Sequence, residues 1–87
     1  MLVKVQLGEK EYIYLNLAQT IIVHFSKEDF TIYIKSVCST ATYHFENEIF
    51  YSNAQDLIDE YTLHPLEEND TEKYRLDVNT GIWYGED

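Results

Sequence analysis

Residues 20–25 read TIIVHF and residues 30–35 read FTIYIK, and these two runs decide the fold. β-branched and aromatic residues dominate both runs, which is typical of strands. In the second run, Phe30, Ile32 and Ile34 alternate with Thr, Tyr and Lys, so one face of the strand is expected to be buried. The short polar loop between the runs predicts that they are neighbouring strands.

Similar signals lie on both sides of this pair. Residues 2–6 and 11–17 are apolar runs separated by a short turn, and they predict a first hairpin. Residues 41–45 continue the alternation of apolar and polar side chains, which predicts a further strand, and residues 46–48 then turn the chain or bulge it. We therefore expect residues 1–51 to be mainly antiparallel strands.

One helix is expected over residues 52–64. The Ser52 side chain can accept a hydrogen bond from the amide three residues later while Gln55 reaches back, which is a capping box. Pro65 ends the run, because the residue before a proline is driven out of the helical conformation. Four apolar residues at i, i+3, i+4 and i+7 form one stripe that would lie on a face of the sheet: Ala54, Leu57, Ile58 and Tyr61.

The last part of the chain is an acidic connector over residues 65–72 followed by a hairpin or arm over residues 73–87. Residues 78–81 (VNTG) suit a turn, since Asn and Gly tolerate positive φ. The whole chain, residues 1–87, is then one domain of the α+β class. We expect a small antiparallel sheet of four to six strands in a meander-like order, with the helix on one face and the hairpin or arm at the end.

The composition limits the classes of protein to which the chain can belong. Three glycines and one proline among 87 residues argue against low complexity. The single cysteine, Cys38, excludes an internal disulfide and suits a reducing cytoplasm. No run approaches the about 20 apolar residues that span a bilayer. The sequence therefore predicts a cytoplasmic protein.

No catalytic, cofactor or metal site is predicted. The three histidines, His24, His44 and His64, lie 20 residues apart, whereas local metal sites usually have ligands about two to five residues apart. Asp56 and Glu60 stand one helical turn apart, but so do many solvated carboxylate pairs. The chain has no glycine-rich phosphate loop and no nucleophile elbow. We do not expect an enzyme.

The charge of the chain is segregated. Residues 1–35 hold four acids and four bases, whereas residues 36–72 hold nine acids and no Lys or Arg, in a chain of formal net charge −10. Such a stretch repels nucleic acids and anionic membranes, and the six scattered bases form no patch that could neutralise phosphates. The expected partner is therefore a basic protein surface.

The leading hypothesis is an inhibitor or decoy whose carboxylates imitate phosphates and cover the basic nucleic-acid-binding surface of an enzyme. In size and charge the chain resembles phage-encoded anti-defence proteins and bacterial toxin-neutralising proteins. The alternative is a housekeeping or structural adaptor, with a homodimer through sheet edges as one form, whose acidity serves only solubility. Acids beside aromatic anchors define the predicted contact residues: Asp56, Asp59, Glu60, Glu67, Glu68, Asp70, Glu72, Tyr74, Trp83 and Tyr84.

Overall fold

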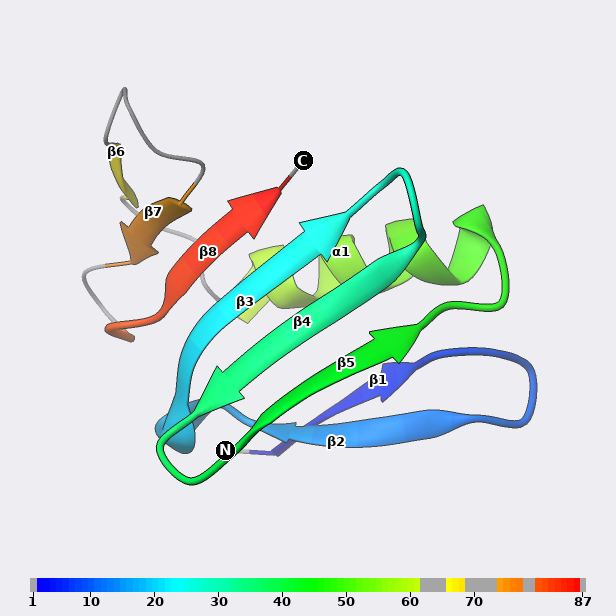
Figure 1. Ribbon diagram of the computed structural model, residues 1–87, viewed down its shortest axis with the longest axis horizontal. Coiled ribbons are helices and arrows are strands. Elements are labelled where there is room, and N and C mark those ends of the chain that lie inside the picture. Colours follow the sequence, from blue (N-terminus) through cyan, green and yellow to red (C-terminus); the bar gives the residue numbers. More distant parts are fainter. Residues whose placement is uncertain (1, 62–65, 69–73, 78–79, 87) are drawn as a thin grey trace.

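The computed structural model describes residues 2–61, 66–68, 74–77 and 80–86 of the chain (Figure 1). A short 3-10 helix, η1, follows the first hairpin, and one α-helix, α1, separates the strands into two groups. The elements in chain order are β1 (Leu2–Gln6), β2 (Tyr12–Asn16), η1 (Leu17–Gln19), β3 (Thr20–Ser26), β4 (Thr31–Ser36), β5 (Thr40–His44), α1 (Glu48–Tyr61), β6 (Leu66–Glu68), β7 (Tyr74–Asp77) and β8 (Trp83–Glu86).

The strands form a six-stranded sheet of order β5-β4-β3-β8-β7-β6 and a separate two-stranded sheet, β1-β2. The predicted α+β class, with several strands and one helix, is confirmed. The main sheet differs from the expected antiparallel meander at one pair, because β8 lies parallel to β3, with Trp83 opposite Ile22. The expected terminal hairpin forms between β7 and β8 and joins the main sheet at its centre.

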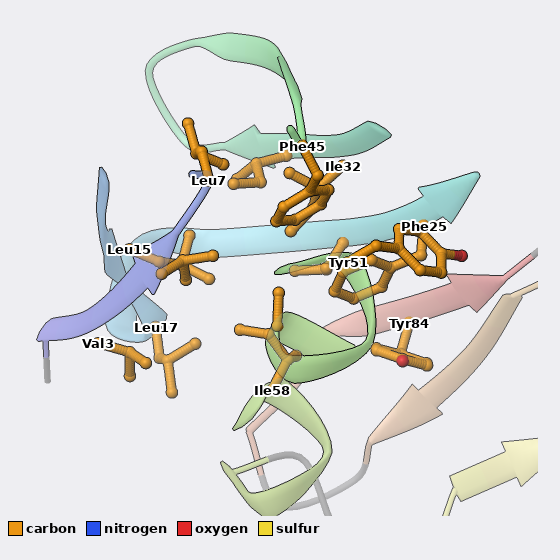
Figure 2. Close-up of a cluster of buried hydrophobic side chains, with 14 of the residues drawn as sticks. Val3, Leu7, Leu15, Leu17, Phe25, Ile32, Phe45, Tyr51, Ile58 and Tyr84 are labelled. Carbon is orange, nitrogen blue, oxygen red and sulfur yellow. The ribbon is translucent and has the colours of Figure 1, made fainter. Parts of the chain in front are cut away.

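One face of the main sheet is covered by α1 together with the β1–β2 hairpin (Figure 1). β3 and β4 direct Val23, Phe25, Ile32 and Ile34 into this core, and the alternation seen in the sequence is the reason. The core is built around aromatic rings (Figure 2). The Phe25 ring lies 5.6 Å from the Tyr51 ring at an interplanar angle of 90°, an edge-to-face arrangement that stabilises aromatic pairs.

The helix begins four residues earlier than the sequence predicted, at Glu48. The Asn47 side chain causes this, because its Oδ1 accepts hydrogen bonds from the Ile49 amide (2.9 Å) and the Phe50 amide (3.4 Å). Ser52, the predicted cap, lies inside the helix and is exposed. Residues 62–64 of the predicted helix lie outside the described residues.

The buried residues of α1 differ from the predicted stripe in the same way. Ala54 and Ile58 are buried as predicted, and Leu57 is partly buried against the same core. Tyr61, in contrast, is 40% exposed, and Tyr51 in the first half of the helix takes its place in the core. Ring contacts with Phe25 and Phe45 therefore hold the N-terminal half of α1.

Part of the predicted acidic connector is a strand. Residues 66–68 form β6, which pairs antiparallel with β7 and is the last strand of the main sheet. Residues 65 and 69–72 lie outside the described residues. In the predicted turn before β8, Gly81 has φ of 75°, a left-handed conformation that glycine adopts readily. No helix within the described ranges has the length and apolar character needed to cross a bilayer.

Candidate protein-binding surface

The outward face of α1 is acidic. Asp56, Asp59 and Glu60 are all exposed, and their i, i+3, i+4 spacing places them on one side of the helix. The opposite side is anchored in the core through Tyr51 and Ile58. The three carboxylates therefore extend from a helix whose orientation is fixed. We call this set the acidic face of α1.

The position of these acids opposes the intrinsic electrostatics of the helix. The C-terminal end of a helix carries a partial negative charge, so bases are favoured in the last turn. The last turn of α1 has no basic residue and contains Asp59 and Glu60. Asp56 and Glu60 are also like charges at i, i+4, which destabilises an exposed helix further. Neither the helix dipole nor the spacing of the acids along the helix therefore accounts for this arrangement.

Two of the predicted acidic contacts lie on β6. Glu67 is paired with Leu76 and Glu68 with Arg75, at the outer end of the main sheet. The C-terminal end of α1 and β6 lie on the same side of the molecule (Figure 1). The backbone thus places two further acidic residues on the side where the acidic face of α1 ends. Asp70 and Glu72 lie outside the described residues.

The predicted aromatic contacts separate onto two faces. Tyr84 is only 2% exposed, and its ring lies 5.9 Å from that of Phe25, so it belongs to the core and is removed from the candidate surface. Trp83, its neighbour in β8, faces the opposite side of the sheet and is half-buried. Tyr74 lies on β7, paired with Gly85.

The face of the main sheet that carries Trp83 is not covered by α1 or by the first hairpin (Figure 1). Strand register places Ile22 beside Trp83 and His24 beside Tyr33 on this face. All four side chains are half-buried. The sequence contained a signal for this face, because residues 21–23 are three consecutive apolar residues instead of an alternating pattern.

A second group of aromatics was missed by the sequence analysis. Tyr12 and Tyr14 of β2 are 51% and 60% exposed, with rings 5.6 Å apart in an edge-to-face arrangement. The Lys4 ammonium lies 4.3 Å above the Tyr12 ring, a cation–π contact. The spacing of the two tyrosines at i, i+2 on a short strand was the available signal.

His24 and His44, the two histidines that the structure describes, lie on strands that are separated by β4. His24 is half-buried on β3 and His44 is exposed on β5, while His64 lies outside the described residues. Within the described ranges, no three His, Cys, Asp or Glu side chains form a group that could hold a metal ion. Cys38 is an exposed free thiol in the turn between β4 and β5.

Known proteins offer no assignment for this surface. Comparison of the chain with models of protein families, with curated proteins and with solved structures gives no significant match.

Proposed function

We propose that this protein is an acidic protein-binding module that acts as an inhibitor or decoy by covering a basic nucleic-acid-binding surface of an enzyme. The observation that carries the proposal is the acidic face of α1, with acids in the last helical turn and no base there. The backbone of β6, which carries Glu67 and Glu68, lies on the side of the molecule where α1 ends (Figure 1).

The placement of the acids favours binding over solubility as their role. Acids that serve only solubility would be equally effective at positions that favour the helix, such as its first turn. In this chain, Asp59 and Glu60 instead occupy the end where they oppose the helix dipole. Residues that break a local rule of helix stability are typical of functional surfaces. A row of carboxylates on a rigid helix would also accelerate encounter with a cationic partner.

A pair of matched variants tests the proposal. Asp56→Lys/Glu60→Lys reverses the charge of two of the three acids on the acidic face of α1. Glu28→Lys/Asp29→Lys makes the same change in net charge at exposed positions of the β3–β4 turn. Each protein is immobilised in lysate at low salt, and bound proteins are eluted with duplex DNA. The parent and the turn variant should release nucleic-acid-binding proteins to the DNA, whereas the helix variant should retain few.

Three results would contradict the proposal. Equal capture by both variants would show that net charge alone matters. Release by neutral detergent but not by DNA or salt would point to an apolar contact, because screening weakens only the electrostatic one. If the immobilised protein captures only a second copy of the chain, the result would favour the alternative hypothesis, an adaptor whose acidity serves only solubility.

A further inference from the structure

Two cavities lie between the β1–β2 hairpin and β5, and we call the space that contains them the groove. The hairpin is attached at both ends of β5, because the Glu46 amide donates to the Leu7 carbonyl (2.8 Å) and the Val37 amide donates to the Gln19 carbonyl (3.0 Å). Between these attachments the two segments are not paired, since β5 is the terminal strand of the main sheet and β1 pairs only with β2.

The backbone of β5 presents hydrogen-bonding groups toward this groove. The Ser36 amide donates to the Ser39 carbonyl and the Phe45 amide to the Phe30 carbonyl, and β4 and β5 pair between them without a register shift. In an antiparallel ladder, hydrogen-bonded pairs alternate with residues whose N–H and C=O groups point away. Counting from these two hydrogen-bonded pairs, the residues of β5 whose N–H and C=O groups point away from β4 are Thr40, Thr42 and His44.

The two cavities of the groove differ in their lining. The first, of about 150 Å³, lies between Ser39, Ala41 and Tyr43 on one side and the β2 residues 13–16 on the other, and no charged side chain lines it. The second, of about 340 Å³, is lined by Leu7, Gly8, Glu11, His44 and Glu46. One end of the groove is thus uncharged, and the other end holds two carboxylates.

The carboxylate of Glu46 is held in position. Its Oε2 accepts a hydrogen bond from the Glu9 amide (3.0 Å). It approaches the hairpin turn closely, since a Cβ added to Gly8 would lie 2.5 Å from this oxygen. Glycine at position 8 therefore permits the approach, and Glu46 is oriented before any partner arrives.

We propose that an extended segment of the basic partner lies in this groove, pairs its backbone with β5, and places a Lys or Arg side chain between Glu11 and Glu46. The proposal rests on the function proposed above and specifies how the partner would be oriented. Charge complementarity selects the occupant, because the acidic end of the groove would repel an acidic segment. Strand addition to a free sheet edge is a common mode of peptide recognition.

Within β5 itself, the sequence and register features that normally prevent such pairing are missing. Edge strands are usually protected by Lys, Pro or a bulge. Thr40–His44 contains neither Lys nor Pro, and its register with β4 is regular. The first cavity is too small for most ligands, which need about 300 Å³ or more, but it suits one apolar side chain of an extended segment.

The test uses a blocked six-residue peptide of Thr and Val with one central Arg, followed by amide NMR of the protein. We expect the largest shifts at Thr40, Thr42 and His44 and a dissociation constant on the order of 1 mM, a weak affinity suited to so short a segment. Glu11→Gln should weaken binding by about threefold, as for an exposed ion pair. Glu86→Gln, an exposed acid on β8, should leave it unchanged.

A second peptide separates strand pairing from charge attraction. N-methylation at alternate residues keeps the Arg but removes the donors that would pair with β5, so binding should weaken at least tenfold. Equal binding of both peptides, or equal effects of the Glu11 and Glu86 variants, would overturn the proposal. A different result is that the peptide experiments fail while the Asp56→Lys/Glu60→Lys variant still loses its captured proteins. That result would reject the groove as the binding site and retain the proposed function.

Discussion

On its inward face α1 buries Tyr51, Ala54 and Ile58, whereas on its outward face it exposes Asp56, Asp59 and Glu60. The inward residues follow the rules of a stable amphipathic helix. The outward residues break two of them, the preference for bases at the C-terminal end and the avoidance of like charges one turn apart. The two faces of α1 are therefore expected to make opposite contributions to the free energy of unfolding. Three changes on α1 measure the difference.

The largest effect is expected on the inward face. Ile58 is fully buried, so Ile58→Ala should lower the free energy of unfolding by about 2–5 kcal/mol through lost burial and the cavity left behind. Urea denaturation followed by circular dichroism measures this loss. A change below about 1 kcal/mol would mean that α1 is not anchored in the core as described.

An intermediate effect is expected at the start of the helix. Asn47→Ala removes the side-chain acceptor for two helix amides and should lower the free energy of unfolding by about 1 kcal/mol. Ser52→Ala, at the cap predicted from the sequence, should be neutral or slightly stabilising, because alanine is the better helix former. The same denaturation series compares the two variants. The reverse order would place the helix start at residue 52.

The smallest effect, with the opposite sign, is expected on the outward face. Glu60→Lys should raise the free energy of unfolding by about 0.3–1 kcal/mol at low salt, since a base then faces the negative end of the helix dipole. Glu48→Lys is the matched control, because the same change in the first turn should lower stability by a similar amount. Both shifts should shrink in high salt. A destabilising Glu60→Lys would remove the argument that this face is maintained for binding.

The sequence predicted the parts of the fold that depend on local pattern. The strands around residues 20–25 and 30–35 appear where the alternation of β-branched residues placed them. The predicted start of α1 was wrong. Ile49, Phe50 and Tyr51 resemble a strand in the sequence, and the capping residue Asn47 lies within an apparent turn. The parallel pairing of β3 with β8 is a contact between distant segments, for which neither segment carries a local signal.

The candidate surface, like the fold, was predicted only where a local pattern determines it. Helical periodicity was sufficient to place Asp56, Asp59 and Glu60 on the exposed side. It was not sufficient for Trp83 and Tyr84, since adjacent strand residues face opposite sides and the sequence does not say which side is covered. The groove beside β5 was inaccessible to such reasoning, because it depends on the contact between distant segments in which the Leu7 carbonyl of the first hairpin accepts from the Glu46 amide.

The parallel pairing of β3 with β8 has a consequence for biosynthesis. The two strands are separated by about sixty residues, so a nascent chain on the ribosome presents β3 long before β8 emerges. During that interval the segment TIIVHF offers one bare edge that is rich in β-branched residues and contains no Asp, Glu, Lys or Arg. A chaperone that shields this hexapeptide, or rapid synthesis of the remaining codons, would therefore decide how much of the protein escapes aggregation.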